Sequence, residues 1–351
     1  MSREENERND NRAAEVTEDQ PTLSPGRIKF ALILALIGFA AFSLLLGRYP
    51  KPGFLLPGTL MQDSLAQSLV WNLRLPRLIA AVLLGCVLGA AGMVFQMIFA
   101  NPLVEPGFLG VSQGAAFGAA FSIILLGNNA WMVQGSAMVF AILGLTFSYT
   151  LAHRIRFGGW ILRLILAGIS VSALYSAGLG VLKVLADPLL QLAEITFWLL
   201  GGLWSVTWDR LLSVLPVGLL GLAVVHSLRW RLNLLSLNDE TAFSLGALPG
   251  RERTILLAAA VASTAAVISI SGIIGWVGLI VPHISRRIFG ADAQHSLQGS
   301  IIIGGLFMLI CDDVARTLLA GEIPLGILTS FLGAVLFLIL MSVRRRRRRT
   351  G

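Results

Sequence analysis

Three charged residues within one apolar stretch are the first candidates for chemistry in this sequence, namely Asp312, Asp313 and Arg316. Neighbouring aspartates inside a membrane could share a proton in a protease or pass protons in a coupled carrier. Consecutive residues point to different faces of a helix, however, which argues against a shared proton. Asp312 and Arg316 are four residues apart on one helical face, so we expect them to pair near the outer membrane boundary.

A histidine at the end of an apolar run, His283 after Pro282, is a candidate ligand for a metal or haem. No second histidine stands at ligand spacing, because the other three are scattered at positions 153, 226 and 295. One histidine does not make a metal site, so we expect a structural role for His283 and no metal bound by the chain. Cys86 and Cys311 lie in apolar segments and are expected to be unpaired.

Two signatures of enzymes are missing from the sequence. It contains no His-Glu-x-x-His pair for a catalytic zinc and no Gly-x-x-x-x-Gly-Lys-Ser/Thr loop for nucleotide phosphates. We therefore expect neither a catalytic site nor a bound cofactor in this chain. If ATP drives its activity, the ATP and its magnesium are used by a separate partner.

The composition predicts the elements that position these residues. The chain has 351 residues, of which 56% are hydrophobic and 13% are charged, whereas a soluble domain carries roughly 25% charge. A bilayer core accommodates about 20 apolar residues per helix, and runs near that length recur along the sequence. Strands of a membrane barrel would alternate in polarity, and these runs do not. We predict an all-α polytopic membrane protein.

Ten spans are predicted, with both termini in the cytoplasm. On this arrangement 20 of the 27 Lys and Arg residues lie inside and seven outside, which satisfies the positive-inside rule. The spans are expected at about 28–47, 77–99, 108–127, 131–152, 163–185, 209–228, 253–271, 274–289, 298–320 and 325–343.

The two ends of the chain differ from the predicted transmembrane domain at 27–343. Residues 1–26 are polar and lack the early apolar run of a signal peptide, so we expect a disordered N-terminal tail. Residues 344–351 contain six consecutive arginines and are expected to form a basic C-terminal tail.

Six sequence blocks, in order, resemble the FecCD-type permease family of ATP-binding-cassette importers for iron–siderophores, haem and cobalamin. The resemblance covers about residues 28–343, and the chain departs from the usual family residue at Gln113, Asn238 and Trp276. The blocks are Arg74-Leu75-Pro76-Arg77; Gln96 with Asn101-Pro102-Leu103 and Pro106 to Ser112; Trp198 to Gly202; Leu232 to Gly246; residues 275–290; and Asp312 to Ile327.

The resemblance implies an assembly in the cytoplasmic membrane of a prokaryote. Family members pair as homodimers or close pseudo-dimers, with the translocation path at the interface. Two separate ATPase subunits dock on the cytoplasmic face, and an extracytoplasmic binding protein delivers the cargo. Membrane lipid surrounds the subunit, and nothing indicates binding of nucleic acid.

The loop at 229–253 is the longest predicted cytoplasmic connection, and the resemblance implies that it couples to the ATPase. Its central residues are expected to form a short helix ended by glycine, followed by a turn at Pro249-Gly250. The alternative is an ordinary solvated loop. The expected coupling residues are Asp239, Glu240, Ser244, Leu245 and Gly246.

Arg74, Arg77 and Arg316 fall on the predicted outer side, against the positive-inside rule. The resemblance implies that they pair with acidic residues of the binding protein. The alternative is that they reach towards lipid headgroups. For Arg316 a further alternative is neutralisation by Asp312.

Two more blocks are expected to shape a gate. Asn101, Pro102, Pro106 and Gly107 predict a fixed turn that holds the third span, with Glu105 solvated. The run with Gly275, Gly278, Pro282 and His283 predicts a short, adjustable span beside the cytoplasmic mouth.

The predicted function is the membrane subunit of an importer for a bulky metal chelate. Iron–siderophore is favoured because that class is numerous, and haem or a corrinoid such as cobalamin are the alternatives. An ion-coupled secondary transporter is the alternative of another class, and it would need more intramembrane charges than the sequence contains.

Overall fold

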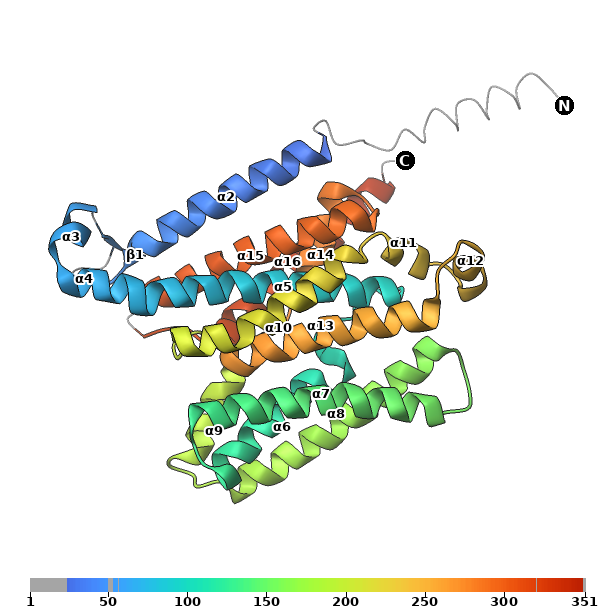
Figure 1. Cartoon of the computed structure of the whole chain (residues 1–351), viewed down its shortest axis with the longest axis horizontal. Coiled ribbons are helices and arrows are strands. Elements are labelled where there is room, and N and C mark those ends of the chain that lie inside the picture. The colour runs from blue at the N-terminus through green and yellow to red at the C-terminus, as the bar shows by residue number, and fades with distance from the viewer. Residues whose placement is uncertain (1–23, 50–52, 56, 320, 350–351) are drawn as a thin grey trace.

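Helices make up almost all of the computed structural model, which describes residues 24–49, 53–55, 57–319 and 321–349 (Figure 1). The first half contains α2 (Pro25–Leu45), β1 (Leu46–Gly47), β2 (Gly53–Phe54), α3 (Pro57–Gln62), α4 (Ser64–Leu69), the π-helical turn η1 (Val70–Arg74), α5 (Leu75–Ile98), the 3-10 turn η2 (Pro106–Leu109), α6 (Val111–Phe121), the π-helical turn η3 (Ser122–Leu126), α7 (Ala130–Arg154) and α8 (Trp160–Leu185).

The second half contains two short helices between long ones. It comprises α9 (Gln191–Leu200), α10 (Trp208–Ser227), α11 (Arg231–Leu235), α12 (Asp239–Ser244), α13 (Pro249–Ser271), α14 (Val277–Phe289), α15 (Ala293–Thr317) and α16 (Leu325–Arg349). The β1–β2 pair is a two-residue antiparallel ladder, so the all-α prediction is correct apart from this hairpin.

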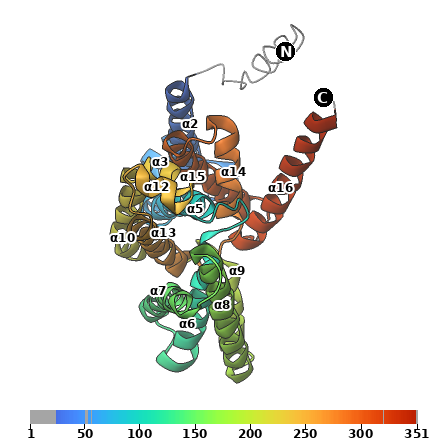
Figure 2. The same cartoon turned by 90° about the vertical axis from the view of Figure 1, so that its right-hand side faces the viewer.

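Helix α5 lies at the centre of the bundle, packed against α10, α13, α14 and α15. In the most apolar 18-residue window of Ser64–Ile98, 78% of the residues are buried within the protein, against 6% for α2. A helix so apolar and so exposed as α2 must be covered by lipid or by another subunit. Viewed along the long axis, α6 to α9 form a second group below, and α16 leans away from α15 (Figure 2).

Seven of the described helices are long and apolar enough to cross a membrane. They coincide with seven of the ten predicted spans. The other three predicted spans fall on shorter helices, namely Val111–Leu126, α14 and the apolar part of α16 at Leu325–Leu340. At about 1.5 Å per residue, the 13 residues of α14 cover only part of a bilayer core.

Four boundaries differ from the predictions. The span expected at 274–289 becomes helical only at Val277, because Gly272 and Trp276 have φ values of +68° and +71° that interrupt the helix. Pro249-Gly250 is not a turn, since Pro249 is in the first turn of α13, where its missing N–H costs nothing. Helix α2 begins at Pro25, and α16 continues to Arg349. Residues 1–23 and 350–351 of the predicted tails lie outside the described part of the chain.

The bundle has two distinct ends (Figure 1). We call the end that carries α11 and α12 the coupling end, and α2 begins and α16 ends there as well. The opposite end, which carries β1, β2 and α4, also holds Arg74, Arg77 and Arg316, and we call it the arginine end.

Candidate functional site

Helix α14 is held against α5 by a side chain that replaces a missing backbone donor. Pro282 has no N–H, so the carbonyl of Gly278, four residues earlier, has no helical partner. Gln96 of α5 donates from Nε2 to that carbonyl at 3.2 Å and to the Leu279 carbonyl at 3.0 Å. Its Oε1 accepts a hydrogen bond from the Arg286 guanidinium. Gln96 therefore repairs the break that Pro282 makes in α14.

Glycines bring the two helix backbones into contact at the same level. A Cβ atom on Gly92 of α5 would lie 1.9 Å from the Gly278 carbonyl oxygen. A Cβ on Gly278 would in turn meet the ring of Pro106 at 2.7 Å. The predicted gate residues Pro106, Gly278 and Pro282 therefore lie together, whereas Gly275 has no neighbour within 4 Å of the position of a Cβ.

Glu105 is only partly exposed, and it bonds the N-cap residue of α14 where a solvated side chain was expected. Its Oε2 accepts a hydrogen bond from the Trp276 N–H at 3.3 Å. Trp276 is the N-cap of α14 and has a left-handed backbone, which is uncommon for a bulky side chain. A carboxylate at a helix N-terminus is stabilised by the exposed N–H groups. The prediction failed because nothing local in the sequence shows that position 105 meets position 276.

The segment before η2 is the fixed turn that its prolines predict. Asn101 accepts a hydrogen bond from the Leu103 N–H at 2.9 Å, which closes an Asx turn around Pro102. Gly110 (φ +79°) joins η2 to α6, so the turn does lead into the third predicted span. Gly107 faces Ser112, whose Oγ would lie 2.4 Å from a Cβ at position 107.

A cavity of about 370 Å³ lies beside this turn, between α5, α6, α8 and α13. Its polar lining residues are Glu105, Ser112, Gln113, Ser172 and Thr264. Residues 110–114 match the Gly-x-Ser-x-Gly spacing of a nucleophile elbow. Ser112, however, follows a 3-10 turn instead of a strand, and it has no histidine partner among the described residues.

Replacing Gln96 with leucine is expected to loosen α14. The variant keeps the side-chain size but leaves the Gly278 carbonyl without a donor, at a cost of about 1–3 kcal/mol. The measurement is the thermal midpoint of the purified protein in detergent, together with hydrogen exchange in 277–289. Gln134→Leu is the control, since Gln134 is equally buried but bonds a side chain, Ser213. A Gln96→Leu protein with wild-type exchange in α14 would contradict this role.

The coupling end carries the predicted short helix, which is α12. Asn238 caps it by accepting the Thr241 N–H at 2.9 Å, and Gly246 (φ +81°) follows it. Asn238 is the residue that departs from the family pattern, and it makes a favourable cap. Phe243 and Leu245 are 65% and 57% exposed, so this rigid element presents apolar side chains outward. Asp239, Glu240 and Ser244 are exposed as well.

Arg253, in the second turn of α13, joins this helix to α12. Its Nη1 donates to Asp239 at 2.6 Å, and its Nη2 donates to the Leu235 carbonyl at 3.0 Å. The residue is 5% exposed although it lies beside a polar loop. Arg231 adds a hydrogen bond to the Gly246 carbonyl at 2.9 Å. Arg253 therefore links α13 to α11 and to the start of α12, and Arg231 links α11 to the residue after α12.

A second set of polar contacts joins α11 to α15. Asn233 donates to Asp292 at 2.7 Å and accepts the Ala293 N–H at 2.9 Å. Burial raises the pKa of Asp292, but the Asn233 hydrogen bond, the Gln294 N–H and nearby cations hold it below its usual value. Asp292 therefore stays charged at neutral pH and keeps its place as the N-cap of α15.

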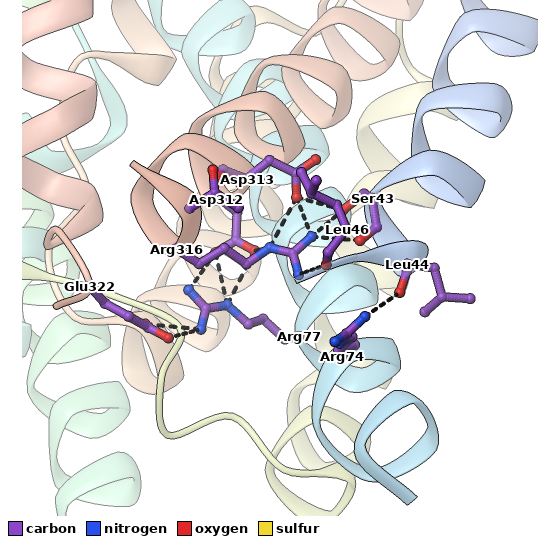
Figure 3. Close-up of polar contacts among 10 residues, drawn as sticks. Ser43, Leu44, Leu46, Arg74, Arg77, Asp312, Asp313, Arg316 and Glu322 are labelled. Carbon is purple, nitrogen blue, oxygen red and sulfur yellow. Dashed lines mark hydrogen bonds and ion pairs between the residues drawn. The ribbon is translucent and has the colours of Figure 1, made fainter. Parts of the chain in front are cut away.

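The arginine end holds the three predicted arginines, of which Arg77 and Arg316 bond carboxylates (Figure 3). Arg77 bonds Asp312 through Nε at 2.9 Å and Glu322 through Nη1 at 2.8 Å. Arg316 bonds Asp313 and donates to the Leu46 carbonyl at 2.8 Å. The expected Asp312–Arg316 pair is present only at 3.8 Å, because Arg77, 235 residues away in sequence, takes Asp312 instead. The two aspartates serve different partners, as their different helical faces predict.

Arg74 differs from the other two arginines. Its Nη1 donates to the Leu44 carbonyl at 3.2 Å, and it makes no ion pair with a described carboxylate. It lines an open pocket of about 250 Å³ in which Glu322 is the one acidic residue. The other lining residues are Gly47, Arg48, Leu73, Arg77, Leu203, Trp204, Val206 and Arg316.

His283 is half-buried in α14, and the described residues contain no group of three or more His, Cys, Asp or Glu side chains that could hold a metal ion. Cys86 and Cys311 are free, as expected.

Comparison with known proteins identifies the family. The profile of the FecCD transport family matches residues 24–343. The chain is similar to the molybdate import system permease protein MolB of Haemophilus influenzae, with 38% identity over 336 residues that cover 93% of this chain and 98% of that protein. It is also similar to the hemin transport system permease protein HmuU of Yersinia pestis, with 36% identity over 338 residues that cover 93% and 99%.

A solved structure gives the same result. An inward-facing transporter described as a metal-chelate type ABC transporter matches with a TM-score of 0.84 and 36% identity, over 90% of this chain and 99% of that one. The chain therefore belongs to the FecCD transport family and is a multi-pass membrane permease subunit of a metal-chelate-type ATP-binding-cassette importer, not an enzyme.

Proposed function

We propose that this chain pairs with a second permease subunit, most simply a second copy of itself, and forms the path of an ATP-driven importer for a bulky iron–siderophore. The observation that supports this best is α12, a capped helix with exposed Phe243 and Leu245 that is bonded to α13 through Arg253. An exposed apolar surface on a rigid element outside the apolar spans fits a partner groove. We assign that groove to the ATPase subunits.

The proposed topology follows from the two ends of the bundle. The coupling end is cytoplasmic, with both termini there, and the arginine end faces the extracytoplasmic binding protein. Arg229, Arg231, Arg251 and Arg253 belong to the α10–α13 connection at the coupling end, in agreement with the positive-inside rule. Arg74 is the arginine best placed to meet an acidic side chain of the binding protein, because it has no described carboxylate partner.

Haem, cobalamin and molybdate are the competing cargoes, since relatives are named for hemin, cobalamin and molybdate transport. Molybdate is the second candidate because the MolB relative is 38% identical to this chain, against 36% for the hemin relative HmuU. Another relative, FhuG of Bacillus subtilis, is named as an iron(3+)-hydroxamate import permease.

Competition for uptake distinguishes these cargoes. The permease is reconstituted in liposomes with its ATPase and binding protein, and uptake of a radiolabelled iron–siderophore is measured with excess unlabelled haem, cobalamin or molybdate. We expect labelled iron to accumulate and only a siderophore to compete. ATP-dependent accumulation of radiolabelled molybdate without iron uptake would overturn the proposed cargo and leave the importer assignment intact.

A further inference from the structure

Glu322 occupies the outward side of Arg77 at the arginine end. The Arg77 guanidinium gives Nε and Nη2 to Asp312, both at 2.9 Å, and gives Nη1 to both oxygens of Glu322 at 2.8 and 2.9 Å. The Asp312 side chain is 3% exposed, whereas the Glu322 side chain is 38% exposed. Arg77 therefore has one buried, permanent counter-ion and one at the surface (Figure 3).

The surface counter-ion is the weaker of the two. An exposed ion pair contributes little to stability, whereas an arginine removed from a buried carboxylate leaves a charge without compensation. A new carboxylate arriving from solvent can therefore replace Glu322 but not Asp312. It would enter the pocket of about 250 Å³ that Arg74 and Arg77 share. There it would lie next to Arg74, which pairs with no described carboxylate.

Glu322 also belongs to the segment that leads into α16. The next residue, Ile323, donates its N–H to the Ala315 carbonyl at 3.0 Å, and Leu325 donates to the Gly201 carbonyl at 2.9 Å. Gly326 packs so closely on the end of α9 that a Cβ would lie 2.4 Å from the Leu200 carbonyl oxygen. The position of Glu322 is thus linked within a few residues to the first turn of α16 and to α9.

We propose that Glu322 is a built-in competitor for the docking protein. An acidic side chain of the extracytoplasmic binding protein first meets Arg74 and then replaces Glu322 on Arg77. The released segment 321–324 loosens the start of α16 and its contact with α9. This inference rests on the proposed docking at the arginine end, and it adds a residue that opposes docking until the correct partner arrives.

The test uses the assembled transporter in lipid nanodiscs and its own binding protein. Glu322→Gln keeps the size of the side chain and removes the competing charge. Asp187→Asn is the matched control: Asp187 is exposed at the same end, and asparagine can still accept the Leu189 and Leu190 N–H groups. Arg74→Gln removes the proposed first contact. The readouts are the Kd and association rate at several salt concentrations, and hydrogen exchange in 321–328.

We expect Glu322→Gln to tighten docking by about fivefold, mainly through a faster association rate, and Arg74→Gln to weaken it by a similar factor. Asp187→Asn should stay within about twofold of wild type, because a single distant surface charge is largely screened. Hydrogen exchange in 321–328 should rise on docking in the wild type and be raised beforehand in Glu322→Gln.

Two results would overturn the proposed replacement of Glu322 on Arg77. Each can be told apart from a result in which the binding protein does not dock at all. If Arg74→Gln weakens docking while Glu322→Gln binds no tighter than wild type, Glu322 does not compete and docking stands. Unchanged hydrogen exchange in 321–328 on docking would likewise show that Glu322 is not displaced. If the wild-type transporter does not bind its binding protein at all, the proposed docking fails and the exchange of carboxylates fails with it.

Discussion

Replacing Arg253 with glutamine is expected to lower cargo uptake at least tenfold while the partner ATPase continues to hydrolyse ATP. Arg253, in the second turn of α13, bonds the end of α11 and the start of α12. Without it, α12 can move in the ATPase groove without moving α13. The variant should therefore separate the two activities.

The expected loss of uptake follows mainly from the buried hydrogen bond between Arg253 and the Leu235 carbonyl. A charged hydrogen bond to a buried carbonyl, such as that of Leu235, contributes about 1.5–3 kcal/mol. The ion pair with Asp239 adds less than about 1 kcal/mol, because that carboxylate is 66% exposed. Loss of both frees α13 from these two contacts with α11 and α12, and the Arg231 hydrogen bond to the Gly246 carbonyl remains.

Uptake and ATP hydrolysis measured on the same proteoliposomes provide the test. Arg251→Gln is the control, since Arg251 is an exposed arginine two residues earlier in the same helix. It should retain wild-type uptake. An Arg253→Gln transporter with wild-type uptake per ATP hydrolysed would show that α12 transmits its movement by another route.

Alanine at position 92 is expected to prevent correct folding. The added Cβ would lie 1.9 Å from the Gly278 carbonyl oxygen and 2.7 Å from its Cα, and a backbone cannot give way as a side chain can. Membrane helices that touch through glycines depend on this close approach. Overpacking against backbone should cost about 3 kcal/mol or more, and it would also displace Gln96 from α14.

Gly38→Ala is the matched control, because a Cβ at Gly38 in the exposed helix α2 would meet no atom within 4 Å. Size-exclusion profiles and thermal midpoints in detergent report the result. We expect Gly38→Ala to match wild type and Gly92→Ala to yield little monodisperse protein. A monodisperse Gly92→Ala protein with a wild-type midpoint would mean that α5 and α14 are not in contact at this level.

Local signals in the sequence predicted the helices well. Length and polarity placed each of the ten predicted spans on a helix, and residues 239–246 indicated a short helix ended by a glycine. Proline was ambiguous, because Pro249 can end a turn or begin a helix and only the structure shows that it begins α13. Helix α9 was missed because a ten-residue apolar run is too short to be read as a span.

Contacts between distant residues could not be predicted. Gln96 bonds the carbonyl of Gly278, 182 residues away, which Pro282 leaves without a helical donor. Glu105 bonds Trp276, and Arg77 instead of Arg316 forms the close ion pair with Asp312. Each depends on which helices are neighbours and at what height, and no periodicity within one span contains that information. The glycine contacts that set these heights are visible in sequence only as small residues.

ATP-dependent uptake is the most direct test of transport through this subunit. The permease is reconstituted with its ATPase and binding protein, with ATP inside the liposomes, and labelled chelate is followed with an active ATPase or with one whose catalytic glutamate is replaced. We expect accumulation only with the active ATPase, and no effect of collapsing the ion gradients. Accumulation that persists with the inactive ATPase and disappears when the gradients collapse would contradict an ATP-driven importer and favour an ion-coupled carrier.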